Sequence, residues 1–114
     1  MKVSKQACPV DMVCRLVQDR AAFVLLRRLS EYPSRRFSEL MDDVGGISTR
    51  TLTIRLKELE GCGMIKRTAY REAPPRVEYS LTPSGKAFRK VLNSMADWSK
   101  NNLPAKAQLR RAKA

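Results

Sequence analysis

Histidine is absent from this chain of 114 residues, and cysteine occurs only three times. Without histidine, the sequence offers no Ser-His or Cys-His catalytic pair and no histidine-ligated metal. The spacing of the three cysteines fits no zinc motif. No pair of carboxylates, no nucleophile beside a base and no phosphate-binding loop is recognisable either. The sequence therefore predicts a protein that is not an enzyme and that uses no cofactor or metal.

Long apolar segments are also missing. The longest uncharged apolar run, Ala21–Leu26, is only a few residues long, whereas a helix needs about 20 residues to span a bilayer. The first residues, MKVSKQACP, hold no apolar stretch of signal-peptide length. These absences predict a cytoplasmic protein with no membrane partner.

Acidic residues are scarce relative to basic ones. The chain has 11 Asp and Glu against 23 Lys and Arg, a formal net charge of +12. Such an excess attracts polyanions, of which nucleic acid is the commonest. An anionic membrane surface is the competing partner, but it requires a basic amphipathic helix with bulky apolar residues on its other face. Since 43% of the residues are apolar, we expect a folded domain and not a disordered basic tail. From its charge we expect this domain to bind double-stranded DNA and to be associated with the nucleoid.

Apolar spacing and capping residues predict four helical regions. They are expected over 10–29 with a polar break at 18–20, over 36–44, over 49–60, and from 83 to about 98. Gly45-Gly46 forces a turn before the third region, and Ser48 is its N-cap. Thr82-Pro83 supplies a cap and a first-turn proline for the last region.

Two strands are expected between the last two helical regions. They cover 64–71 and 77–81, and they flank the stiff turn Ala73-Pro74-Pro75, so they form a hairpin. Residues 1–7 are expected to form an N-terminal arm, 8–103 the domain, and 104–114 a basic, frayed tail. Helix, tight turn, helix, hairpin and helix is the order of a winged helix-turn-helix. The expected fold is α+β but mostly α, with a two-stranded β-hairpin wing and extra N- and C-terminal dimerisation helices.

The second helix of such a pair enters the major groove of DNA. If the three leucines of 49–60 face the core, the helical step turns the polar side chains of that segment to the far side. Arginine can fork to guanine, and threonine or isoleucine can touch a thymine methyl. The candidate DNA-binding residues, including basic residues before the helix pair and in the wing, are Arg35, Arg36, Ser48, Thr49, Arg50, Thr53, Ile54, Lys57 and Arg76.

Each of these assignments has an alternative without function. The polar side of 49–60 is also what an ordinary solvated helix presents. Arg35 and Arg36 would serve equally as a basic loop kept for solubility. Arg76 would equally form a salt bridge to Glu72 or Glu78.

The chain resembles the HxlR-type winged helix-turn-helix transcriptional regulators over roughly residues 8–99. The matching motifs are CPV (8–10), RFSEL (36–40), GIS (46–48), LT…LKELE…G.I.R (52–67) and Y.E.PPRVEYSLT..G (70–85). The resemblance implies a bacterial or archaeal regulator that binds DNA as a homodimer built from its N- and C-terminal helices. The residues that it assigns to dimerisation are Val13, Leu16, Phe88, Val91, Leu92, Met95 and Trp98. The alternative is that this stripe packs inside one subunit.

The chain departs from the family at Gln18-Asp19-Arg20-Ala21, where members usually carry Gly-Gly-Lys-Trp. The loss of that tryptophan removes a large packing element from the first helix junction. It leaves the helix that contacts DNA unaffected.

Cys8 matches the cysteine that some family members use to sense electrophiles or oxidants. A thiol at a helix N-terminus has a lowered pKa, and Pro9 supports that placement, whereas Asp11 works against it. The alternative is an unreactive, half-buried residue. The expected function is a sequence-specific, homodimeric transcriptional regulator with a possible thiol response. A non-specific architectural DNA-binding protein and a protein-interaction module are the alternatives.

Overall fold

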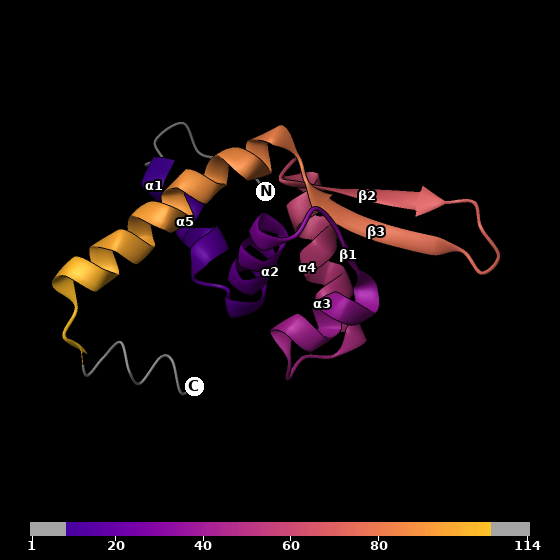
Figure 1. Ribbon diagram of the computed structural model, residues 1–114, viewed down its shortest axis with the longest axis horizontal. Helices are drawn as coiled ribbons and strands as arrows, with labels where there is room; N and C mark the ends of the chain where they lie inside the picture. Colours follow the sequence, from indigo (N-terminus) through magenta and orange to yellow (C-terminus); the bar gives the residue numbers. More distant parts are fainter. Residues whose placement is uncertain (1–8, 106–114) are drawn as a thin grey trace.

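The structure is a computed structural model in which residues 9–105 are described. Five helices and three strands follow one another in these residues (Figure 1). The helices are α1 (Pro9–Val17), α2 (Arg20–Glu31), α3 (Phe37–Val44), α4 (Thr49–Gly61) and α5 (Pro83–Asn102). The strands are β1 (Arg35–Arg36), β2 (Ile65–Tyr70) and β3 (Arg76–Leu81). The expected order of helix, turn, helix, hairpin and helix is confirmed.

Side-chain caps fix where three of the helices begin. Asp19 accepts a hydrogen bond from the backbone N–H of Ala22 at 2.9 Å and so caps α2. Ser48 caps α4 and Thr82 caps α5 in the same way, each with its side-chain oxygen 3.1 Å from a backbone nitrogen of the first turn. These bonds satisfy backbone donors that have no partner within the helix. The expected caps at 48 and 82 are confirmed.

Helix α2 lies at the centre of the molecule and packs against α1, α3, α4, α5 and β3. Its Leu25, Leu26 and Leu29 are at most 1% exposed. The remaining core side chains come mainly from α3, α4 and the sheet; the most deeply buried of them are Leu40, Val44, Leu52, Leu56, Leu59 and Ile65. Burial of a large apolar side chain contributes about 1.5–3 kcal/mol, so this leucine-rich contact sets how α3 and α4 sit on α2.

The sheet has three antiparallel strands in the order β1-β3-β2. Strands β2 and β3 form the expected hairpin, with Ile65 paired to Leu81 and Tyr70 to Arg76. Strand β1 is the difference from expectation: Arg35 pairs with Tyr79 along the other edge of β3. Two residues are too few to show the alternation that marks a strand, and β1 exists because β3 offers a free edge.

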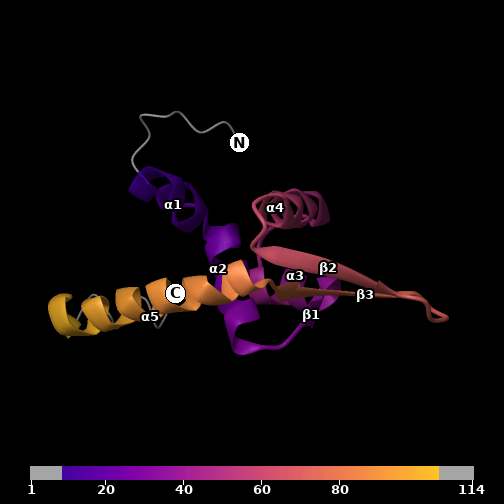
Figure 2. The same ribbon diagram turned by 90° about the horizontal axis from the view of Figure 1, so that it is seen from above.

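The hairpin and α5 extend from opposite sides of the helical centre (Figures 1 and 2). Phe88, in the first half of α5, is 9% exposed and lies in the core of its own chain, which differs from the expected dimerisation role. Val13, Leu16 and Leu92 pack partly on the same core. Within residues 9–105, no helix is both long and apolar enough to cross a membrane.

Candidate nucleic-acid interface

Helix α4 turns its leucines inward and leaves the opposite side in solvent. Its three leucines are at most 2% exposed. Arg50 and Lys57 are exposed, Ile54 is 41% exposed and Thr53 is half-buried. Within residues 9–105, neither Arg50 nor Lys57 forms an ion pair. This side of α4 therefore combines free cations with β-branched side chains, the groups that contact phosphates, guanine and thymine methyls.

The first turn of α4 uses its hydroxyl groups on its own backbone. The Ser48 hydroxyl accepts from the Thr51 N–H and lies 3.1 Å from the Thr51 hydroxyl. The Thr53 hydroxyl donates to the Thr49 carbonyl at 2.8 Å. Ser48 and Thr49 remain exposed at a helix N-terminus, where the backbone dipole favours a negative charge. The methyl group of Thr53 is thus left for an apolar contact.

Arg35 is occupied within its own chain. Its guanidinium lies 2.9 Å from Asp43 and 3.2 Å from Glu39, and it stacks over the ring of Tyr32 at 4.2 Å. The hydrogen bonds to Asp43 raise the pKa of Arg35 above its usual value. Arg35 was expected to contact DNA phosphates. In the structure its side chain instead binds carboxylates of α3 and fixes α3 against β1. Arg36 is exposed.

Arg76 is likewise held by carboxylates. Its guanidinium lies 3.0 Å from Glu72 and 2.9 Å from Glu78, and it stacks over Tyr70 at 4.0 Å. The salt-bridge alternative is thus the arrangement that the structure contains. Glu78 also accepts a hydrogen bond from Ser34 at 3.0 Å. Arg76 therefore braces the end of the hairpin.

The hairpin also has three free cations that were not among the candidates predicted from the sequence. Lys66, Arg67 and Arg71 are exposed and form no ion pair among the described residues. The residues opposite Lys66 and Arg67 on β3 are Ser80 and Tyr79, which carry no negative charge. The strand register, which the linear sequence does not give, therefore shows that no acidic residue lies opposite these two cations.

A groove brings the hairpin and α4 together. Its volume is about 480 Å³, and its lining includes Thr53 and Lys57 of α4 and Arg67 of β2. The buried leucine side of α4 fixes this juxtaposition, because α4 packs on both α2 and β2. Thr53 and Lys57, two of the candidate DNA-binding residues of α4, thus lie beside Arg67 of β2.

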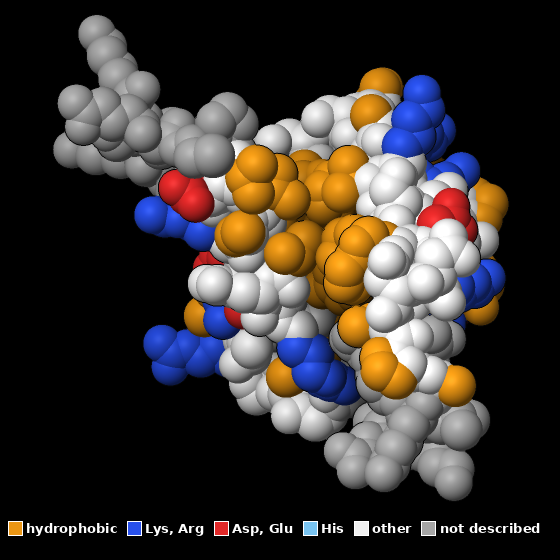
Figure 3. Space-filling view, turned by 90° about the vertical axis from the view of Figure 1, so that its left-hand side faces the viewer, with side chains coloured by type: hydrophobic (Ala, Val, Ile, Leu, Met, Phe, Trp, Pro, Cys, Tyr) orange, Lys and Arg blue, Asp and Glu red, His pale blue; other side chains and the backbone are white. Residues whose placement is uncertain are grey.

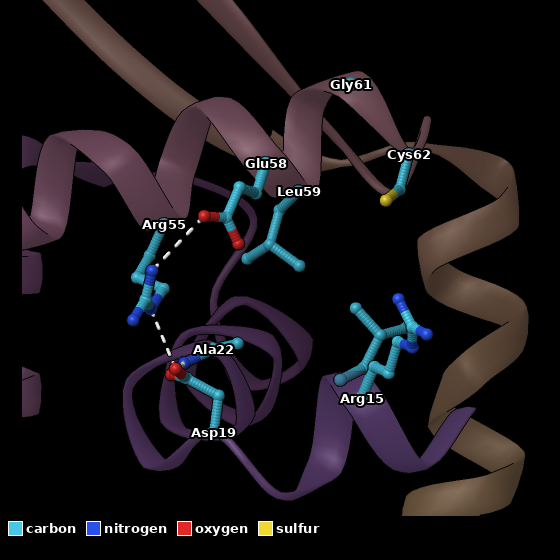
Figure 4. Close-up of a pocket in the computed structure, with 9 residues that line it drawn as sticks. Arg15, Asp19, Ala22, Arg55, Glu58, Leu59, Gly61 and Cys62 are labelled. Carbon is cyan, nitrogen blue, oxygen red and sulfur yellow. Dashed lines mark hydrogen bonds and ion pairs between the residues drawn. The ribbon is translucent and has the colours of Figure 1, made fainter. Parts of the chain in front are cut away.

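The junction that departs from the family motif has its own polar contacts. Asp19, besides capping α2, lies 2.7 Å from the Nε atom of Arg55, and Arg55 also contacts Glu58 at 3.1 Å (Figure 4). Arg20 donates to the carbonyl oxygens of Val44 at 2.7 Å and of Gly45 at 3.3 Å. These bonds tie the start of α2 to α4 and to the end of α3. Sequence spacing gave no indication of them.

The second half of α5 carries exposed apolar side chains. Val91 and Met95 are each 41% exposed and Trp98 is 59% exposed. Figure 3, which shows this end of the molecule, has apolar side chains gathered in the centre of the face. A hollow of about 690 Å³ between α2 and α5 includes Phe23, Leu92 and Met95. An exposed apolar patch of this kind is typical of a protein interface.

The structure describes two of the three cysteines. Cys8 lies outside the described residues, so its expected place at a helix N-terminus is untested. Cys14 and Cys62 are both free thiols and exposed.

Comparison with known proteins agrees with this geometry. The model of the HxlR-like helix-turn-helix family matches residues 16–107. An HTH-type transcriptional regulator of Synechocystis is 43% identical over 95 residues, which is 80% of this chain and 70% of that protein. The reduced form of the transcriptional regulator YodB from Bacillus subtilis superposes with a TM-score of 0.76 at 29% identity, covering 88% of this chain and 98% of that one. The redox regulator HypR in its reduced form gives a TM-score of 0.77 at 29% identity, covering 89% and 99%. The chain belongs to the HxlR-like helix-turn-helix family and is a DNA-binding transcriptional regulator of the winged helix-turn-helix type.

Proposed function

We propose that the protein regulates transcription as a sequence-specific homodimer, with α4 of each subunit in a major groove. The observation that carries the proposal is the outward side of α4, where Arg50 and Lys57 are exposed and unpaired within residues 9–105. Arg50 forks to a guanine, and Thr53 and Ile54 contact thymine methyls. Lys57 contacts phosphate, because a lysine serves as a point charge.

The wing and the start of α4 supply phosphate contacts in this proposal. Ser48 and Thr49 present the N-terminal turn of α4 to the backbone. Arg36, Lys66, Arg67 and Arg71 contact neighbouring phosphates, because each is exposed. Arg35 and Arg76, held by carboxylates, keep α3 and the hairpin at the angle that allows this.

The dimer is built on the exposed apolar side of α5. Val91, Met95 and Trp98 face a second copy, with Leu92 at the edge and Val13 and Leu16 of α1 contributing from the N-terminal side. A small domain has little core of its own, so sharing apolar helices across a two-fold axis is physically favourable. A two-fold dimer requires a pseudo-palindromic site, with half-sites separated by about 34 Å or a multiple of it.

A thiol response through Cys8 is a further part of the proposal. Its support is the sequence CPV at the expected start of α1 and the similarity to HypR, which is named a redox regulator. Cys8 should then react with a neutral alkylating reagent faster than the exposed Cys62. Equal labelling rates at the two thiols would contradict a tuned sensor.

Selection of bound duplexes from a random pool, with and without oxidant, tests the proposal. A sequence-specific dimer enriches two related half-sites at a fixed spacing, and an oxidant changes the recovery through Cys8. A non-specific architectural protein enriches none and binds all duplexes alike at fixed salt. That second outcome would replace the proposed function with the architectural one.

A further inference from the structure

A second hollow lies on the opposite side of α4 from the proposed DNA contacts. Its volume is about 510 Å³, within the range of about 300–1,000 Å³ typical of small-molecule sites. The end of α1, the start of α2 and the last turns of α4 enclose it. Figure 4 shows the labelled side chains of Arg15 and Cys62 directed into it from α1 and from the end of α4.

The lining of this hollow is apolar at its base. Leu16 is half-buried, Ala22 is 6% exposed and Leu59 is 1% exposed. A ligand that fills the base therefore needs an apolar body, because burying a polar group there without a partner is costly.

Of the charged side chains at the rim, some are paired with each other and one is not. Asp19 and Glu58 are both engaged by Arg55, at 2.7 and 3.1 Å. The side chain of Arg15, in contrast, is exposed and forms no hydrogen bond or ion pair with any residue in 9–105. Arg55 and its two carboxylates together carry one net negative charge, and Arg15 brings the formal charge of the lining to zero. Arg15 is therefore the guanidinium of the lining that has no carboxylate bound to it, and it faces the apolar base.

We propose that this hollow binds a small organic monoanion, with its apolar body against Ala22 and Leu59 and its carboxylate on Arg15. A guanidinium and a carboxylate pair through two parallel hydrogen bonds. A phosphate or a dianion fits less well, because Arg15 is the one free cation of the lining and the C-terminal carbonyls of α4 repel added negative charge. The ligand contacts one side of the last turns of α4, while DNA contacts the other side of the helix, from Thr49 to Lys57.

Cys62 makes occupancy measurable without any reference to DNA. It lines the hollow and is exposed, while Cys14 is exposed on α1 outside the lining. In a Cys8→Ser background, iodoacetamide alkylates both remaining thiols, and peptide mass analysis gives the rate at each. Cys14 is then an internal reference in the same molecule.

The probe is sodium benzoate, compared with the neutral benzamide and with sodium chloride at equal concentration. At about 10 mM, a ligand with a Kd of about 1 mM fills about nine tenths of its sites. Benzoate should therefore slow alkylation of Cys62 about tenfold and leave Cys14 unchanged, and benzamide should have little effect. Arg15→Gln should remove the protection, whereas Arg71→Gln, an equal charge change in the wing, should keep it.

Three results would overturn the proposal. They are an unchanged rate at Cys62, equal protection by benzamide, and protection that survives Arg15→Gln. Since the readout is a labelling rate, it stands even if the protein binds no specific DNA sequence.

Discussion

Arg50 is the residue whose substitution separates base recognition from general attraction to DNA. It is exposed on α4 and has no ion pair to lose within residues 9–105, so Arg50→Ala should leave the fold intact. We predict a loss of about 1–3 kcal/mol in binding to the selected duplex, with relaxed preference at one base pair. Fluorescence anisotropy with single-base variants of that duplex measures both.

Arg36→Ala is the matched comparison, because it removes the same charge from a position assigned to phosphate. It should weaken specific and random duplexes alike and reduce the salt slope of binding by about one. An equal loss on specific and random DNA for Arg50→Ala would exclude Arg50 from the residues that contact bases.

Gly85 marks a place where the backbone of α5 passes very close to another segment. A Cβ atom at this position would lie 2.1 Å from the Met64 carbonyl oxygen and 3.0 Å from a Leu81 methyl group. The carbonyl belongs to the backbone and has no rotamer to change, so the start of α5 would have to move. We predict that Gly85→Ala lowers the free energy of unfolding by about 1–3 kcal/mol in urea.

Gly61 provides the control for this substitution. It is the last residue of α4, and a Cβ atom there meets nothing within 4 Å. Gly61→Ala should change stability by less than about 1 kcal/mol, and in the stabilising direction, because alanine favours the helix. Equal effects of the two substitutions would contradict the close approach at Gly85.

At the scale of elements, local sequence patterns predicted those features that depend on a single helix. The leucine row predicted which side of α4 is buried, and Ser48 and Thr82 predicted where α4 and α5 begin. The sequence was insufficient where a charge is satisfied by another element. Arg76 was weighed equally between DNA and an ion pair, and only the hairpin geometry brings it within 3.0 Å of both Glu72 and Glu78.

For a similar reason, no local sequence pattern predicted strand β1 or the ion pairs of Arg35 with Glu39 and Asp43. Arg35 pairs with Tyr79, 44 positions later, and its carboxylate partner Asp43 lies on the last turn of α3. Likewise Phe88 shares the apolar spacing of the exposed α5 residues, but it lies in the part of α5 that packs on the core. Periodicity identifies an apolar side and not what covers it.

Asp19 performs two tasks at the α2–α4 junction, and substitutions separate them. Asp19→Asn should keep the helix cap, because asparagine caps as well as aspartate, and lose the ion pair to Arg55. Asp19→Ala loses both. Both side chains of the pair are about 30% exposed, so the pair itself should contribute less than about 1 kcal/mol.

A double-mutant cycle in urea measures these terms. We predict a coupling of about 0.5–1 kcal/mol between Asp19→Asn and Arg55→Ala. Asp19→Ala should cost about 1 kcal/mol more than Asp19→Asn, because the N–H of Ala22 loses its partner. A zero coupling would show that the contact does not join α2 to α4 in solution.

At the scale of the whole molecule, the fold separates its functions by position. The hairpin and α5 extend in opposite directions from α2 (Figure 2), so a partner bound along α5 leaves α4 and the hairpin free. The net charge of +12 repels a second copy at long range, and this repulsion is screened by salt. An apolar interface on α5 must therefore outweigh it, which makes dimerisation stronger as the salt concentration rises.

Trp98 is the residue that tests this assembly. It is 59% exposed in the single chain, so Trp98→Glu removes no core contact and should keep the melting temperature measured by circular dichroism. In a dimer the introduced carboxylate would be buried beside its two-fold copy, which is strongly unfavourable. We predict that sedimentation velocity gives the mass of two chains of 12.9 kDa for the wild type and of one chain for Trp98→Glu.

Lys86→Gln changes the net charge by the same single unit as Trp98→Glu. By the helical step of about 100° per residue, Lys86 lies on the side of α5 away from Val91, Met95 and Trp98. It should therefore sediment as a dimer at every salt concentration at which the wild type does. A Trp98→Glu protein that stays dimeric would show that another surface joins the subunits, and the half-site spacing on DNA would then have to be derived from that surface.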